Sequence, residues 1–360
     1  ESWILDMGAI HGVEQDNNEL KIDLIDDDGD SISKARIAKV SPDSSGIEAE
    51  EVDRLDENLA YRANVSGFME TPLHISLSGD IDGREAIKVF YSDSSAAADS
   101  IQITDLPATA DYLVNAMDQG YEIRFPENDL AVTRKVEGYD KDGVAQLFKY
   151  LQHIAQWRFL KYLDNAATTI TPDPPLDIHI FEVELDGNEN EVFNDNYRLT
   201  IKPSSVPQRD SDESPSGEIR IKIRNNSGSS FYCALLYLSQ DFGVYDLIEG
   251  STIELNPDEE VWARGATKIP FSQEAFIKND NWEGETHYLK LLVSSNTFDV
   301  TQLTKDKLPH PGDGPDIAKK GLDVTERSGV SASSWTSQMV QIRIPNPYFE
   351  TTSSERSAGA

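Results

Sequence analysis

Short strand-like runs separated by turn residues make up most of this sequence. Apolar and polar residues alternate over 21–24 and 35–40, as they do in strands that bury only one face. Asp28-Gly29 and Ser44-Ser45-Gly46 supply turn signals between such runs. Because an isolated strand cannot bury its apolar face, a chain built in this way has to form sheets. The sequence therefore predicts a mainly β protein.

The first 168 residues divide into two expected modules. Residues 1–72 hold only short runs, and a small β-barrel-like module is the natural solution for them. Residues 73–168 mix strand-like runs with helical periodicity, which favours an α/β module. Its strands are expected at 73–77, 87–90, 101–104, 121–124 and 130–133, and a short helix at 111–118.

The clearest helix is predicted at 143–163 and ends the α/β module. Its apolar residues repeat at helical spacing, namely Val144, Leu147, Phe148, Leu151 and Ile154. Asp140 or Asp142 can cap its first turn. Further apolar residues, including Trp157, extend the apolar surface around much of the helix. We expect such a helix to pack between domains or under a partner.

A proline-rich linker at 169–175 marks the clearest domain boundary. It contains Pro172, Pro174 and Pro175 and cannot be helical. Strand-like runs and turns then alternate over 176–348, and their number and spacing favour a β-sandwich domain. The small, polar end of the chain, 349–360, is expected to be a disordered tail.

Charge, length and cysteine content limit the functions open to the chain. Its 360 residues suffice for two or three domains, and its formal net charge is −32. Phosphate backbones and anionic membrane surfaces repel such a polyanion, so we expect no nucleic acid and no membrane as partner. A single cysteine fits a reducing compartment, most simply the cytoplasm. The start at Glu1, without Met, suggests a piece of a longer protein.

No residue stands in a convincing catalytic or metal-binding arrangement. Cys233 lies in the continuous apolar run 231–238, where burial makes a thiol inert. His11 has no cysteine partner in a suitable setting further along the chain. The acidic run 26–30 fails the ligand pattern of an EF-hand. The sequence therefore predicts no catalytic residue, no metal site and no cofactor.

Seven residues are candidates for binding a partner: Trp157, Asp210, Asp212, Glu213, Trp282, His310 and Trp335. The acidic ones lie in the expected loop 204–217, which is either a solvated surface or a docking site for a basic partner. Trp282 and Trp335, with Trp262 and Tyr348, either form an exposed stacking platform or pack in a core. The histidine lies in a second expected loop, 309–334.

Three stretches together resemble the region that follows the peptidase domain in bacterial caspase-family proteins. They are 8–13 with 38–40 and 61–63; 146–158; and 219–227 with 231–238 and 241–244. The first is similar to a small β module, and the second to a helix that closes a middle module. The third, with Leu235-Leu236-Tyr237-Leu238 followed by Asp241-Phe242-Gly243, is similar to a C-terminal sandwich.

The resemblance implies a parent caspase-like cysteine endopeptidase in bacterial defence or stress signalling. Its catalytic His and Cys would precede Glu1, and no catalytic residue carries over to this chain. The chain would be a non-catalytic accessory region that recruits substrate, senses a signal or restrains the protease. Its partners would be the protease domain, its substrate or its regulator.

Two other functions remain open. The chain could be a stand-alone binding protein whose β-sandwich takes a peptide or a glycan. It could also be a hydrolase that uses paired carboxylates, because 64 acidic residues make such pairs unreadable from sequence.

Overall fold

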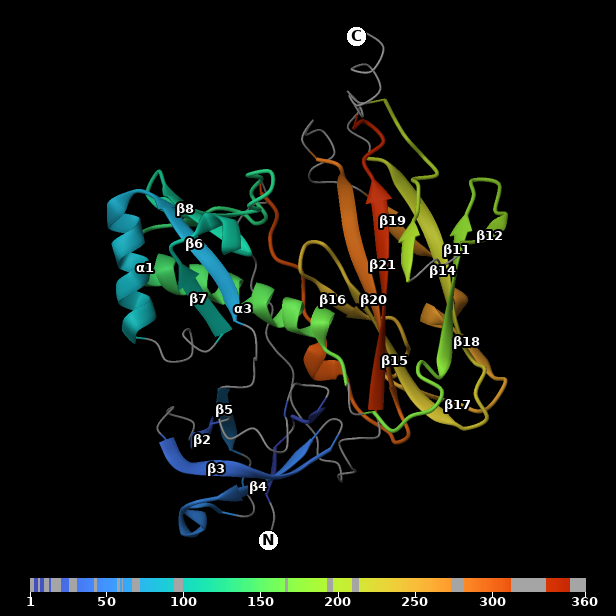
Figure 1. The fold of residues 1–360 in the computed structure, drawn as a ribbon, viewed down its shortest axis with the longest axis horizontal. Coiled ribbons are helices and arrows are strands. Elements are labelled where there is room, and N and C mark those ends of the chain that lie inside the picture. Colours follow the sequence, from blue (N-terminus) through green and yellow to red (C-terminus); the bar gives the residue numbers. More distant parts are fainter. Residues whose placement is uncertain are drawn as a thin grey trace. The chain divides into compact units, whose positions relative to one another are not determined.

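The chain, seen here in a computed structural model, divides into two compact units (Figure 1). The structure describes residues 3–5, 7–9, 13, 21–25, 31–41, 44–56, 59, 61–66, 72–93, 100–165, 168–192, 197–208, 214–272, 282–311 and 335–349. Unit 1 comprises Glu1–Asp173, Ser294–Leu303 and Leu308–Ser337. Unit 2 comprises Pro174–Val293, Thr304–Lys307 and Gln338–Ala360. The chain first passes from one unit to the other within the proline-rich stretch.

The first sheet of unit 1, sheet A, joins short antiparallel strands in the order β1-β4-β3-β2-β5. They are β1 (Trp3–Leu5), β2 (Lys21–Ile25), β3 (Ser31–Val40), β4 (Ser45–Ala49) and β5 (Arg62–Ser66), and η2 (Val52–Arg54) follows β4. Alternation along β2 places Ile22 and Leu24 on its buried face, where they pack with Leu5, Ala35 and Ile47. Because β1 and β5 end the order, the described strands form an open sheet and not the barrel-like closure that we expected.

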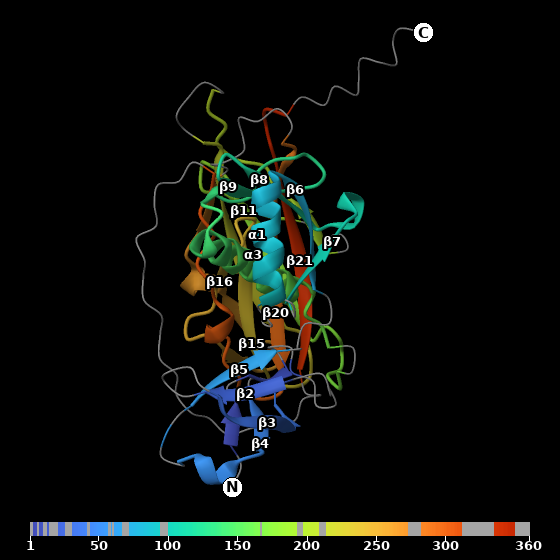
Figure 2. The same ribbon diagram turned by 90° about the vertical axis from the view of Figure 1, so that its left-hand side faces the viewer.

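The second sheet of unit 1, sheet B, is mixed and has the order β10-β9-β8-β6-β7. Its elements are β6 (Leu73–Gly79), α1 (Ile81–Asp93), β7 (Ile101–Thr104), η3 (Pro107–Thr109), β8 (Tyr112–Met117), β9 (Gly120–Arg124), β10 (Val136–Glu137) and α3 (Lys141–Tyr162). β6 lies between β7 and β8 and runs parallel to both, while β9 returns antiparallel to β8. Helix α1 contacts β6 and β8, as Figure 2 shows from the side of this unit.

Helix α3 confirms the clearest prediction from the sequence. It begins after Asp140, whose carboxylate accepts a hydrogen bond from the Gly143 amide at 2.9 Å. This cap satisfies one of the amide groups that the first helical turn leaves without a partner. The apolar side of the helix is buried, and Phe148 stacks on Phe90 of α1 with ring centroids 4.9 Å apart. The two helices therefore share one core with sheet B.

Three predictions within this module are wrong. The run 130–133, expected as a strand, contains only an isolated bridge between Ala131 and Arg124. The run 87–90, expected as a strand, lies inside α1, and 111–118, expected as a helix, is almost entirely β8. Over a wider window Ile87, Phe90 and Tyr91 follow helical spacing, which a four-residue window does not reveal. β8 is instead fixed by non-local pairing, because it lies parallel to β6 along its length.

Unit 2 is built from two further sheets. Sheet C has the order β12-β11-β14-β18, with β19 also paired to β14, and sheet D has the order β13-β21-β20-β15-β16, with β17 also paired to β15. The strands are β11 (Leu176–Val183), β12 (Glu189–Glu191), β13 (Arg198–Thr200), β14 (Ser216–Asn225), β15 (Phe231–Leu238), β16 (Val244–Asp246), β17 (Ile253–Leu255), β18 (Glu260–Trp262), β19 (Ile269–Ser272), β20 (Gly284–Ser294) and β21 (Trp335–Pro345). A short helical turn of unit 2 lies at η4 (Ala263–Ala266), and another, η5 (Thr301–Leu303), belongs to unit 1.

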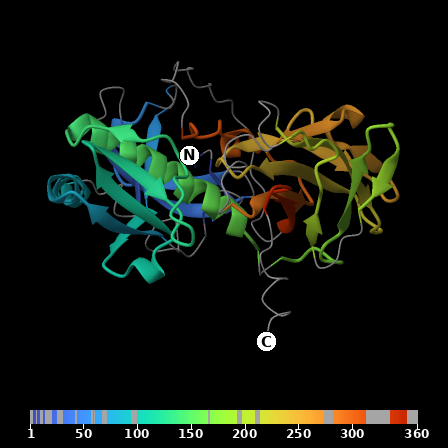
Figure 3. The ribbon, with the colours of Figure 1, turned by 90° about the horizontal axis from the view of Figure 1, so that it is seen from above.

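The two sheets of unit 2 form adjacent layers (Figure 3). On sheet C, Ile178 and Ile180 of β11 lie opposite Ile223 and Ile221 of β14, and all of them are buried. The residues between them in sequence face outward and are polar or aromatic. This alternation is that of a sheet which buries one face against a core. The predicted mainly β fold is confirmed.

Candidate binding pocket

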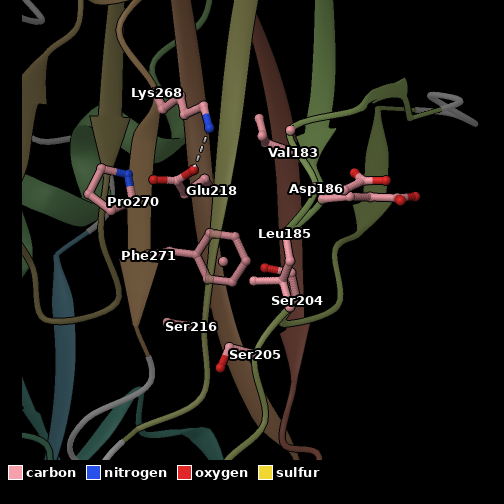
Figure 4. A pocket seen from close by; sticks show the side chains of 13 residues that line it. Val183, Leu185, Asp186, Ser204, Ser205, Ser216, Glu218, Lys268, Pro270 and Phe271 are labelled. Atoms are coloured by element: carbon pink, nitrogen blue, oxygen red, sulfur yellow. Dashed lines mark ion pairs between the residues drawn. The ribbon is translucent and has the colours of Figure 1, made fainter.

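A cavity of about 680 Å³ lies at one end of sheet C in unit 2 (Figure 4). Four short segments line it: 183–187 after β11, 204–205 after β13, 216–218 at the start of β14, and 268–271 along β19. The antiparallel register explains how they meet. Glu218 lies opposite both Val183 of β11 and Pro270 of β19, so three strands present neighbouring positions to the cavity.

The apolar part of the cavity is formed by Leu185, Phe271, Pro270 and Val183. Figure 4 shows the Phe271 ring and the Leu185 side chain next to each other. Phe271 fits closely over Gly217, because a Cβ atom added there would lie 2.4 Å from the ring. Leu185 is 81% exposed, although it is a large apolar residue. Covering such a side chain typically contributes about 1.5–3 kcal/mol, so this wall favours an apolar ligand group.

The rim of the cavity carries charge of both signs but more negative than positive. Lys268 Nζ lies 3.0 Å from Glu218 Oε2, and both side chains are nearly half exposed. Because solvent screens an exposed ion pair, this one adds little stability, but it keeps the two charges next to each other. Glu184 accepts a hydrogen bond from the Asn190 amide at 2.6 Å, and Asp186 accepts one from the Asn188 side chain at 2.7 Å. These two carboxylates therefore have neutral partners and keep their charge uncompensated.

An aromatic–cation cluster lies on the outer face of the same sheet. It consists of Phe181, Arg220, Lys222 and Trp262. The Arg220 guanidinium lies 4.1 Å from the centroid of the Trp262 ring, and Lys222 Nζ lies 5.4 Å from it. Phe181 packs against the same ring, with centroids 5.4 Å apart. The Trp262 ring is therefore in contact with cations of the protein itself. It does not form the open stacking platform that a sugar would need.

A second polar arrangement lies inside sheet D. His287 Nδ1 is 2.9 Å from the Tyr237 hydroxyl, and its Nε2 is 3.0 Å from a carboxylate oxygen of Glu285. Burial, followed by the charges of Glu285 and Asp241, raises the pKa of Tyr237 above its usual value, so the hydroxyl stays neutral. His287 is only 7% exposed. These three side chains are connected in the order Tyr–His–Glu, as in a catalytic relay. However, they form hydrogen bonds with one another in the buried interior.

The residues predicted to bind a partner are not brought together. Trp157, Trp282 and Trp335 are 7%, 6% and 4% exposed, and they lie on α3, before β20 and at the start of β21. Their rings pack inside the protein. His310 is half-buried in a segment after η5. The acidic candidates Asp210, Asp212 and Glu213 lie outside the described residues, as do His11 and the acidic run 26–30.

Sequence reasoning missed the pocket. Its one local signal is the turn Glu184-Leu185-Asp186-Gly187, in which a leucine occupies a position normally given to polar residues. Gly187 adopts a positive φ of 88° there, which glycine tolerates without strain. The other walls come from 204–205, 216–218 and 268–271, which lie further along the chain, and the pairing of β14 with β11 and β19 brings the last two segments next to the end of β11.

Cys233 and the other expected chemistry can also be placed. The thiol is fully buried, which confirms the predicted core position, and burial raises its pKa to about 12, which favours an unreactive thiol. Across the described ranges, no three His, Cys, Asp or Glu side chains gather in a way that could hold a metal ion. None of the described helices combines the length and the apolar character needed to span a membrane.

Comparison with known proteins adds little. No family model matches the chain, and no curated protein matches it. It is similar to a FixG-related protein from Vibrio parahaemolyticus at 8% identity, over 37% of this chain and 91% of that one, with a TM-score of 0.16. It is also similar to a crustacean hemolymph-type prophenoloxidase at 11% identity, over 55% of this chain and 38% of that one, with a TM-score of 0.20. Likeness this low carries no argument about function.

Proposed function

We propose that this chain is a non-catalytic binding protein and that its β-sandwich holds a segment of a partner polypeptide in the pocket at the end of sheet C. One observation carries the proposal: the 81%-exposed Leu185 stands beside Phe271 in the wall of a cavity of about 680 Å³. A cavity of this size accommodates one or two side chains of a partner. Apolar walls within a polar rim are typical of sites that hold a protruding side chain in place.

A polypeptide fits this pocket better than a glycan does. Sugar rings bind by stacking on exposed aromatic faces, and the ring of Trp262 on the same sheet is covered by Arg220 at 4.1 Å. The pocket instead combines aliphatic and aromatic walls with the hydroxyl groups of Ser204, Ser205 and Ser216. Hydroxyl groups of this kind pair readily with the amide and carbonyl groups of a peptide backbone.

We further propose that the parent protein is a caspase-like cysteine endopeptidase, which this chain serves by recruiting a substrate or by sensing a regulator. The support is the resemblance of the three sequence stretches, of which 146–158 lies on α3 and 231–238 is β15. A protease accessory region needs to hold a polypeptide without cleaving it, and the pocket offers such a place. Mass spectrometry of the native polypeptide tests this part. A precursor with a peptidase domain before Glu1 is expected, and a native protein without one would contradict the association.

A peptide selection tests the binding function. A random peptide library displayed on phage should be enriched by the immobilised wild-type chain, because peptides that fill the apolar wall are retained. Leu185→Ser should abolish the enrichment without unfolding the protein, because the side chain is already exposed. Leu106→Ser is the matched control, since Leu106 is also exposed, at 64%, but lies in unit 1. Equal enrichment by the wild-type and Leu185→Ser proteins would refute the proposed site.

A further inference from the structure

Some charged side chains at the pocket are paired with an opposite charge, and others are not. Lys268 is paired with Glu218 at 3.0 Å. Glu184 and Asp186 are hydrogen-bonded to the amides of Asn190 and Asn188, and no described Lys, Arg or His forms an ion pair with either of them. The pocket rim therefore carries two negative charges that remain available to a ligand.

The neighbouring cations do not reverse this balance. Arg220 pairs with Glu189 at 2.6 Å, and Lys222 pairs with Glu260 at 3.1 Å. Each cation of the aromatic–cation cluster is thus already matched by a carboxylate. Because the net charge of the whole chain is −32, the long-range field also attracts cations and repels anions.

The geometry places the apolar and the charged parts within one short stretch of peptide. Leu185 follows Glu184 and precedes Asp186 directly in the turn, so its side chain and the two carboxylates belong to three consecutive residues. Successive residues of an extended chain are about 3.3 Å apart along its axis. A ligand whose apolar side chain reaches Leu185 and Phe271 therefore carries its next residues past the carboxylates.

We propose that the ligand of this pocket is a peptide segment in which an apolar side chain is adjacent to a lysine or arginine. The apolar side chain packs against Leu185 and Phe271, and the cation pairs with Glu184 or Asp186. This inference rests on the proposed peptide-binding function and names the class of peptide. It also gives the acidic character of the domain a specific use, since a basic segment of the partner is drawn to the rim before it docks.

Fluorescence anisotropy of labelled nonapeptides with the full chain tests the inference. The peptides share a Gly/Ser frame and differ only at two central positions, which are Leu-Lys, Leu-Glu or Ser-Lys. We expect Leu-Lys to bind at least about tenfold more tightly than Leu-Glu, a difference of about 1.4 kcal/mol, because the two rim carboxylates attract lysine and repel glutamate. Ser-Lys should bind more weakly than Leu-Lys, and added NaCl should reduce the preference for lysine over glutamate.

Variants separate the charge inference from the binding function. The double variant Glu184→Gln/Asp186→Asn keeps the shape of the turn and should lose the preference for lysine, while Glu249→Gln, an exposed carboxylate away from the pocket, should keep it. Equal binding of Leu-Lys and Leu-Glu that disappears in Leu185→Ser would overturn the charge inference and leave the binding function standing. Failure of the wild-type protein to bind any of the three peptides would overturn both.

Discussion

Single residues show where burial decides chemistry in this protein. Cys233 and Tyr121 are both fully buried and both reactive in principle, yet each is held in its neutral form. The pKa of the thiol is raised to about 12 by burial, and that of Tyr121 is raised to about 12 by burial and then by the nearby Tyr139 and Asp140. The sequence predicted the burial of the cysteine, because it lies in an uninterrupted apolar run.

The thiol of Cys233 should be unreactive in the folded protein. At pH 8 the native chain should not react with a disulfide reagent such as 5,5′-dithiobis(2-nitrobenzoic acid), because attack needs an accessible thiolate. After denaturation one thiol per chain should react within minutes, since the chain has a single cysteine. Rapid reaction in native buffer would show that β15 is not buried as described.

Tyr121 should make the stability of unit 1 sensitive to alkaline pH. Its pKa is higher in the folded state, about 12, than the ordinary value of 10, so the folded state binds more protons between these values. The free energy of unfolding is therefore unaffected by this group below pH 10 and falls as pH rises through about 12. The free energy of unfolding of the Tyr121→Phe variant should fall less steeply over that range.

The same variant also has an effect at neutral pH. The Tyr121 hydroxyl donates a hydrogen bond to the Gly83 carbonyl at 3.1 Å, so its removal should cost about 1 kcal/mol at pH 7. Urea denaturation of both proteins at pH 7, 9, 10 and 11 measures both effects. Parallel pH curves for the two proteins would contradict the assignment of a raised tyrosine pKa.

At the scale of single elements, the type of a helix or strand was predicted correctly where the element is long, as for α3, and incorrectly for the shorter α1 and β8. The long helix α3 (Lys141–Tyr162) was predicted to within two residues at each end, because many apolar residues repeat at one period. The shorter α1 and β8 were assigned the wrong type. Short windows such as 87–90 contain too few residues to distinguish the two periods, and the pairing of β8 with β6 is a non-local interaction that no local pattern encodes.

The cap of α3 should have a measurable effect on stability. Asp140→Ala removes the acceptor of the Gly143 amide and should reduce the free energy of unfolding by about 1 kcal/mol. Asp140→Ser can restore a cap and should lose less. Circular dichroism at 222 nm during urea denaturation follows this change, since α1 and α3 both belong to unit 1. Equal losses in the two variants would mean that the side chain acts through its charge and not as a cap.

At the scale of the whole molecule, the fold class was readable and the site was not. Alternation and turn spacing predicted the mainly β chain, because they act over neighbouring residues. The pocket needs 183–187, 204–205, 216–218 and 268–271 together, and these meet only through strand pairing. The candidates chosen for their chemical type, such as Trp282 and Trp335, are core residues instead, because large aromatic side chains bury the most area.

The net charge of −32 should make stability depend on salt. Repulsion between excess carboxylates destabilises the folded state, and NaCl screens it beyond about 8 Å at 0.15 M. We expect the melting temperature to rise between 20 and 300 mM NaCl, by about 2–4 °C for each 1 kcal/mol gained. A fall would mean that local ion pairs, such as Arg124–Glu122 at 2.6 Å, outweigh the global repulsion.

The central claim is that the end of sheet C holds a partner polypeptide. Amide hydrogen exchange of the full chain, with and without saturating Leu-Lys peptide, tests it most directly, because exchange reports protection segment by segment. The account predicts slower exchange at 183–187, 204–205, 216–218 and 268–271, and unchanged exchange in α1 and α3. Unchanged exchange in the four pocket segments at saturation, or protection confined to other segments, would contradict it.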